Sequence, residues 1–267
     1  MTAGGVGSEG GRDGRSGSDR GSAASGSDRG SASRGGSRDS TEPYCIGHRG
    51  CLVGEPENTI RSALAAAPHV DAVEIDVRRC GSGDIVVVHD PTLERVCDAD
   101  VRVDRCTVDE LRGYGVDGTD EPIPTLRELL AALPVDVDVN VEMKTTGLAA
   151  DVAEALSAVD NEAFVSSFSA RALAELRDVA PGIRRGLLYK RSWERALVAA
   201  DRLDCELLHP YVEAVDRTHL RAAAEAGFTV NAWGVSDSET YHRMVDRGVD
   251  GVIVDDYQCL VDDDADL

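Results

Sequence analysis

Short runs of Val, Ile and Leu alternate with alanine-rich stretches of helical period from residue 44 onward. Such runs are typical of buried strands, and apolar positions three and four residues apart are typical of helices that cover a sheet. The strand-like runs fall near 44–48, 72–77, 85–89, 137–143, 163–168, 184–189, 206–209, 228–233 and 251–255. The helix-like stretches fall near 58–67, 107–113, 125–133, 148–158, 170–179, 192–202, 216–226 and 237–247. This alternation predicts a parallel sheet closed into an eight-stranded α/β barrel.

Nine strand candidates are one more than such a barrel holds, and 85–89 is the extra one. Only residues 80–84 separate it from the preceding run, whereas a parallel crossover needs about a dozen residues or more. The Gly-Ser-Gly sequence there predicts an antiparallel hairpin. With the turn centred near Ser82, Ile75 lies opposite His89, which returns to the barrel rim. Residues 90–124 then form an excursion of turn residues with one short helix.

Residues 1–43 are rich in Gly, Ser, Arg and Asp and have almost no large apolar side chains. Such a segment buries too little surface to offset its ordering entropy, so we expect a disordered, solvating tail before a single barrel domain at 44–267. An Arg/Gly-rich nucleic-acid contact and a misassigned start codon are the alternatives.

The net charge of -21 falls entirely on residues 44–267, because the tail holds six acidic residues and six arginines. Only two lysines, Lys144 and Lys190, accompany 26 arginines. An acidic, lysine-poor surface resembles that of proteins from salt-adapted organisms, in which salt screens the self-repulsion. This charge argues against nucleic-acid binding and against docking to an anionic membrane.

Seven cysteines occur without a CxxC spacing, which favours reduced thiols over a zinc site or a disulfide framework. No apolar run approaches membrane-spanning length, and no apolar signal core begins the chain. We therefore expect a cytoplasmic protein without membrane insertion. The sequence leaves the oligomeric state open.

Three carboxylates interrupt apolar strand runs. Glu74 and Asp76 lie two residues apart and share one face of a strand, and Glu142 ends a later strand beside Lys144. Neighbouring carboxylates repel unless they share a proton or bind a cation. The pattern indicates a hard divalent ion, and Mg²⁺, Mn²⁺ and Ca²⁺ all suit such ligands.

Two histidines, His48 and His89, each end an apolar run. Cleavage of a phosphodiester needs a base for the attacking hydroxyl and an acid for the leaving alkoxide, and histidine serves as both. Arg49 is expected to bind a non-bridging phosphate oxygen. These residues predict a metal-assisted site that cleaves phosphodiesters.

Five short motifs follow one another along the chain in a characteristic order. They are His48-Arg49-Gly50, Pro56-Glu57-Asn58-Thr59, Glu74-Ile75-Asp76-Val77, His89-Asp90 and Asn140-Val141-Glu142-Met143-Lys144. In identity, order and approximate spacing they resemble the signature of the glycerophosphodiester phosphodiesterase family across 44–258. The resemblance continues through Ser167-Phe168, Asn231-Ala232-Trp233 and Gly248-Val249-Asp250-Gly251-Val252-Ile253.

The resemblance implies a TIM barrel that hydrolyses glycerophosphodiesters to an alcohol and glycerol phosphate. It further implies that Glu74, Asp76 and Glu142 hold Mg²⁺ or Ca²⁺, that His48 and His89 are the acid–base pair, that Arg49 and Lys144 bind phosphate, and that Trp233 contacts the glycerol or walls the pocket. For Asn58, substrate binding and capping of the following helix are equally favoured.

Two positions depart from the family pattern. Gly234 stands where the family often has Thr after the late Trp, and residues 254–257 lack its closing Thr and Pro. These changes bear on the substrate rather than on the chemistry. The excursion at 90–124 is short for this family, which predicts an open pocket.

Three other functions compete with this one. A lysophospholipase D on the same barrel is the nearest, although the scarcity of aromatic residues in 90–124 argues against an acyl-binding groove. An inactive binding barrel is disfavoured because every catalytic position is filled. An amidohydrolase-type metal site would need a His-x-His strand end, and the sequence has none.

Overall fold

The computed structural model describes Met1 and residues 42–260. The predicted tail at 1–43 therefore lies almost entirely outside the described residues. Eight parallel strands form a barrel, in the spatial order β1-β9-β8-β7-β6-β5-β4-β2, and pairing of β1 with β2 closes it. The barrel strands are β1 (Tyr44–Gly47), β2 (Ala72–Arg79), β4 (Asp138–Met143), β5 (Ala163–Ser167), β6 (Arg184–Tyr189), β7 (Leu207–Pro210), β8 (Thr229–Val235) and β9 (Gly251–Val254). The predicted TIM barrel is confirmed.

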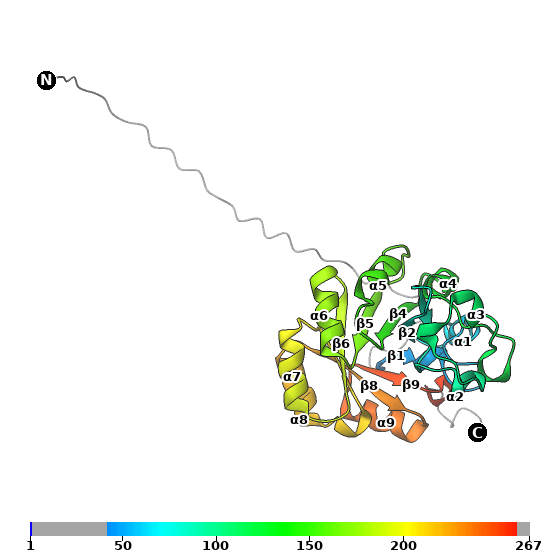
Figure 1. The fold of residues 1–267 in the computed structure, drawn as a ribbon. Coiled ribbons are helices and arrows are strands. Elements are labelled where there is room, and N and C mark those ends of the chain that lie inside the picture. The colour runs from blue at the N-terminus through cyan, green and yellow to red at the C-terminus, as the bar shows by residue number, and fades with distance from the viewer. Residues whose placement is uncertain (2–41, 261–267) are drawn as a thin grey trace, which may run out of the picture. The chain divides into compact units, whose positions relative to one another are not determined.

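Helices surround the strands (Figure 1). They are α1 (Ile60–Ala66), α4 (Leu126–Ala132), α5 (Ala149–Leu156), α6 (Ala170–Val179), α7 (Trp193–Arg202), α8 (Arg217–Glu225) and α9 (Ser238–Arg247). Each presents a narrow apolar stripe to the sheet, as α6 does with buried Ala172, Leu173 and Leu176. Threonine or serine side chains cap the first turns of α1, α4 and α6. The observed helix ends lie within a few residues of the predicted ones.

The extra strand β3 (Ile85–Val87) pairs antiparallel with β2. Val77 lies opposite Val87, and the amide N–H of Val88 donates to the carbonyl of Asp76 at 2.9 Å. This is the register predicted from the Gly-Ser-Gly turn. Because the turn is short, the chain returns to the rim at His89.

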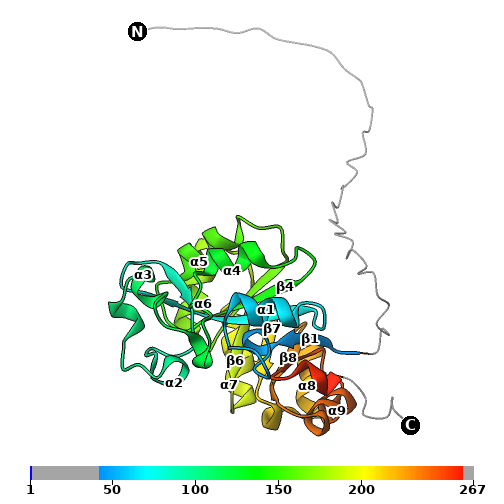
Figure 2. The ribbon, with the colours of Figure 1, turned by 90° about the vertical axis from the view of Figure 1, so that its right-hand side faces the viewer.

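The excursion between β3 and α4 differs from its prediction. One short helix was expected, whereas two short helices form, α2 (Glu94–Cys97) and α3 (Val108–Leu111), together with 3-10 turns at Val103–Arg105 and Val116–Gly118. Apolar side chains from these turns pack into a small core of their own that includes Leu93, Val96, Val103, Leu111 and Ile123. This packing stabilises α2, which is too short to show a helical period in the sequence. Figure 1 places α2 and α3 at the side of the barrel opposite α7 and α8, and Figure 2 again draws α2 and α3 at one edge of the fold.

Two observations concern the predictions of reduced thiols and of no membrane insertion. All seven cysteines are free thiols. Within residues 42–260, none of the helices has both the length and the apolar character that crossing a bilayer requires.

Arg185 is a buried arginine at the amino end of β6, far from the strand ends that carry the predicted site. Its guanidinium donates to four backbone carbonyls, those of Pro181, Ile183, Leu203 and Asp204. It therefore satisfies carbonyl groups of the two loops that precede β6 and β7.

We expect Arg185→Ala to lower the free energy of unfolding by about 3 kcal/mol, because buried carbonyls lose their donors. Denaturant unfolding measures this change. The matched control is Arg184→Ala at the exposed neighbouring position, with an expected change of about 0.5 kcal/mol or less. Equal losses for the two variants would show that the buried hydrogen bonds contribute nothing.

Candidate active site

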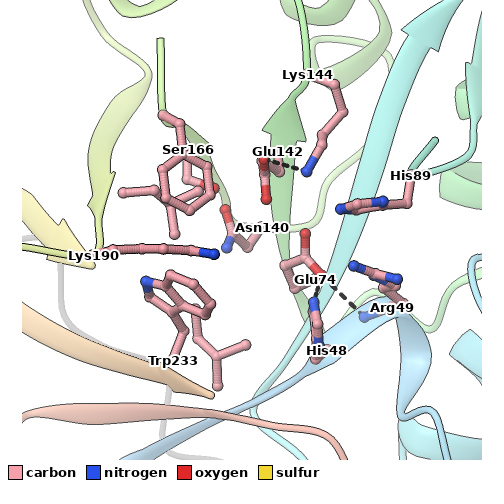
Figure 3. Close-up of a pocket in the computed structure, with 13 residues that line it drawn as sticks. His48, Arg49, Glu74, His89, Asn140, Glu142, Lys144, Ser166, Lys190 and Trp233 are labelled. Atoms are coloured by element: carbon pink, nitrogen blue, oxygen red, sulfur yellow. Dashed lines mark hydrogen bonds and ion pairs between the residues drawn. The ribbon is translucent and has the colours of Figure 1, made fainter. Parts of the chain in front are cut away.

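A pocket of about 220 Å³ opens at the carboxyl ends of the barrel strands (Figure 3). Seven of the nine predicted site residues line it, namely His48, Arg49, Glu74, His89, Glu142, Lys144 and Trp233. The other two, Asp76 and Asn58, are buried, at 0% and 3% exposure, and are not part of its lining.

The backbone after β1 is unusual where it delivers His48 and Arg49. Three successive residues, Arg49, Gly50 and Cys51, have positive φ values of 53°, 78° and 65°. A Cβ at Gly50 would lie 2.5 Å from Ser62 Oγ and 2.7 Å from the Ala63 nitrogen, so only glycine fits. The turn directs the Arg49 amide toward Glu74 Oε2, at 3.0 Å. Strain of this kind often accompanies functional sites.

The three carboxylates meet beside this turn. Asp76 on β2 lies opposite Glu142 on β4, and oxygens of Glu74, Asp76 and Glu142 all lie within 4.8 Å of one another. Burial and the negative charge of Asp76 raise the pKa of Glu74 to about 8. Burial opposes ionisation of Asp76 as well, but the charges of Lys144 and Arg49 lower its pKa to about 2.

These carboxylates fit a hard divalent cation. Glu74 Oε1 is buried without a hydrogen-bond partner among the described residues, so this oxygen is left for a ligand. Carboxylate oxygens are the ligands that Mg²⁺ and Ca²⁺ prefer. The Lys144 ammonium lies 2.6 Å from Glu142 Oε1 and 3.2 Å from Asp76 Oδ1, which offsets part of the negative charge.

Both histidines are oriented by an aspartate. His48 Nδ1 donates to Asp255 at 2.6 Å, and His89 Nδ1 donates to Asp90 at 2.7 Å. Because a carboxylate only accepts, each Nε2 is left to face the pocket. Burial disfavours the charged form of His48, yet Asp255 and Glu74 raise its pKa. Burial lowers the pKa of His89.

Arg49 is held by carboxylates. Its guanidinium lies 3.0 Å from Asp76 Oδ2 and 3.1 Å from Glu57 Oε1. Glu57 in turn accepts two bonds of 2.7 Å from Arg95 of α2. Arg95 also donates to Asp90 at 2.6 Å. Arg95 therefore connects the supports of Arg49 with those of His89.

Asn58 supports Asp76. Its amide donates to Asp76 Oδ2 at 2.9 Å, and its oxygen accepts from the Asp76 backbone N–H at 3.0 Å. The capping alternative is wrong, because Thr59 caps α1 through a capping box with Ser62.

Trp233 lines the pocket in a fixed orientation. Its Nε1 donates to the His209 carbonyl at 3.1 Å, and the Tyr211 ring lies 4.8 Å away, centroid to centroid. Gly234 lies at a bulge of β8 with φ of 87°, and a Cβ there would lie 2.5 Å from the Tyr211 ring. The departure from threonine at this position therefore makes room for Tyr211.

Several residues of the site were missed by sequence reasoning. Asp255, which lies far from its partner His48 in the sequence, was noted only as part of the altered closing motif at 254–257, and Arg95 was not singled out. Asn140, Ser166 and Lys190 also line the pocket. Each of these three lies in or directly after a predicted strand, which was the available signal.

The fold and the pocket define an α/β barrel with a pocket at the carboxyl ends of its strands, where enzymes of this fold carry their active sites. A sequence model of the Glycerophosphoryl diester phosphodiesterase family matches residues 48–258. The chain belongs to this family, and it is a phosphoric diester hydrolase.

Individual relatives agree with this assignment. A glycerophosphodiester phosphodiesterase of Caldanaerobacter subterraneus is 30% identical over 235 residues, which span 81% of this chain and 95% of the relative. The structure of an Oleispira antarctica phosphodiesterase in complex with the product sn-glycerol-3-phosphate is similar with a TM-score of 0.76, at 28% identity over 82% of this chain and 96% of that one. The glycerophosphodiester phosphodiesterase of Thermotoga maritima gives a TM-score of 0.72, at 29% identity over 82% and 97%.

Arg95→Ala removes the link between Glu57 and Asp90. We expect kcat to fall about 10- to 100-fold, because Arg49 and His89 lose their orientation. Since the Arg95 side chain is 49% exposed, guanidinium ion added to the assay should restore part of the rate. Arg102→Ala is the control, because Arg102 of the same excursion pairs with Asp104 at the surface. Unchanged kcat in Arg95→Ala would contradict this role.

Proposed function

We propose that the chain hydrolyses glycerophosphodiesters to an alcohol and glycerol phosphate in a metal-dependent reaction, with His48 and His89 as the general acid–base pair. The observation that carries the proposal is the placement of two aspartate-oriented histidines on either side of Glu74, in the cluster of three carboxylates (Figure 3). The two histidines proposed as acid and base, and two of the three proposed cation ligands, thus border one pocket.

Glu74, Asp76 and Glu142 would hold the cation, with Mg²⁺ or Ca²⁺ favoured and Mn²⁺ also suited. When bound, a divalent cation neutralises phosphate charge and lowers the pKa of a hydroxyl that it contacts. Lys144 and Arg49 border the same region and would orient the phosphate oxygens.

The two histidines would exchange roles in the reaction. One Nε2 takes the proton of the attacking hydroxyl, and the other gives a proton to the leaving alkoxide. A glycerol hydroxyl that attacks phosphorus gives a cyclic phosphate, which water then opens. Direct attack by water is the other route, and both routes use the same pair.

The floor of the pocket suits a polyol. Both side-chain amide atoms of Asn140 and the Ser166 hydroxyl are buried and lack hydrogen-bond partners among the described residues. Substrate hydroxyls would satisfy them. The volume of about 220 Å³ suits a glycerophosphate with a small head group, whereas the acyl chain of a lysophospholipid would extend beyond it.

The proposed setting is the cytoplasm, with small glycerophosphodiesters as substrates. Seven free thiols fit a reducing compartment. The net charge of -21 does not suit a nucleic-acid ligand.

Metal dependence is tested by chelation. We expect EDTA to abolish hydrolysis of glycerophosphocholine, glycerophosphoethanolamine and glycerophosphoglycerol, and excess Mg²⁺, Ca²⁺ or Mn²⁺ to restore it. The same ions should raise the melting temperature of the wild type but not of Glu74→Gln or Glu142→Gln, because binding stabilises only an intact site. Hydrolysis that EDTA leaves unchanged would refute the metal assignment. Adding lysophospholipids to these three substrates tests the lysophospholipase D alternative.

The acid–base assignment predicts that His48→Ala and His89→Ala each lower kcat at least about 100-fold while the barrel stays folded. The control is His242→Ala, at an exposed position of α9. Steady-state kinetics give the rates, and circular dichroism checks the fold. A rate near that of the wild type in either variant would refute the role of that histidine.

A further inference from the structure

Both lysines of this protein line the same pocket. The sequence holds only Lys144 and Lys190 among 28 basic residues, and the other 26 are arginines. An ammonium is a compact charge on a flexible stem, whereas a guanidinium is a broad planar fork. Lysine is absent from the rest of the sequence, and both lysines lie in the proposed substrate pocket. Lys144 already has a role beside the carboxylates, but the proposed reaction leaves Lys190 without one.

Among the described residues, no carboxylate pairs with Lys190, in contrast to the other two basic side chains of the pocket. Arg49 and Lys144 each form ion pairs with Asp76 and a glutamate. Lys190 forms no ion pair with any residue of the 42–260 range. It follows β6 directly, and its side chain extends across the pocket on the side away from His89 (Figure 3). Its neighbours in this part of the lining, Phe168 and Trp233, are uncharged, so Lys190 supplies the charge on this side of the pocket.

The Lys190 ammonium lies 5.4 Å from the centre of the Trp233 ring. Hydrogen bonding to the His209 carbonyl and packing against Tyr211 fix this ring, and Phe168 meets it edge to face at 5.6 Å. A free indole of this kind would attract a quaternary ammonium ligand. In this protein the Lys190 ammonium occupies that position over the ring.

The position of this wall indicates which part of the substrate it meets. Asn140 and Ser166 lie at the buried floor, whereas Lys190 is exposed and Phe168 is 46% exposed at the mouth. The leaving alcohol must reach solvent, so it lies at the mouth while the glycerol hydroxyls meet the floor.

We propose that Lys190, held over Trp233, is a specificity-determining residue that excludes cationic leaving groups. The preferred substrates are glycerophosphodiesters whose alcohol is an uncharged polyol or carries a negative charge. Choline is disfavoured because its ammonium would meet that of Lys190 at the same aromatic ring. This inference rests on the proposed hydrolysis of glycerophosphodiesters.

The test compares kcat/KM for glycerophosphoglycerol with kcat/KM for glycerophosphocholine, in the presence of the divalent ion. The wild type should prefer glycerophosphoglycerol. Lys190→Met should lower the ratio of the two values about fivefold, the size of one exposed charge interaction. Lys190→Arg should keep the wild-type ratio, and Lys190→Glu should favour glycerophosphocholine. Because salt screens exposed charges, these differences should shrink in high salt.

Arg191→Met is the matched control. It removes the same charge at the next position, which does not line the pocket, so the ratio should not change. If Lys190 instead binds the phosphate, Lys190→Met would lower kcat/KM for both substrates equally and leave their ratio unchanged. That result would overturn this inference but not the proposed function. Failure of the wild type to hydrolyse either substrate would overturn the proposed function and this inference with it.

Discussion

The burial of Asp76 is the constraint on which the site depends. Its carboxylate is fully buried, and an ionised group in that position requires charged and hydrogen-bonding partners. Arg49, Lys144 and Asn58 supply them, at 3.0, 3.2 and 2.9 Å. Because the first two also border the pocket, the interactions that stabilise the buried charge also set the geometry of the site.

The same constraint explains why the excursion after β3 has a core of its own. Arg49 is oriented partly by Glu57, and Glu57 is held by Arg95 of α2 and by a hydrogen bond from its own backbone N–H to Asp117. A loop without packing would place these groups poorly. The small apolar cluster under α2 and α3 fixes them, so the excursion supports the side of the pocket that carries Arg49 and His89.

Local periodicity explains how much of this could be predicted from the sequence. Alternation along β2 placed Glu74 and Asp76 on one face, and the length of the turn was sufficient to return His89 to the rim. Long-range partners leave no such local signal, because Asp255 lies 207 residues from His48. Asn58 was misleading, since asparagine suits both a cap and the left-handed φ of 57° that it adopts here.

The acidity of this protein and the negative charge of a phosphodiester are compatible for a physical reason. At about 0.1 M salt, exposed charges more than roughly 10 Å apart interact weakly, so the distant surface contributes little inside the pocket. Inside the pocket, the nearby charged side chains determine which ligands are attracted. On the wall that carries His48, Arg49 and Lys144, the two basic side chains are paired with carboxylates. On the opposite wall Lys190 is unbalanced within the described residues. Lys190 therefore makes one side of the pocket locally receptive to anions in a chain whose net charge is -21.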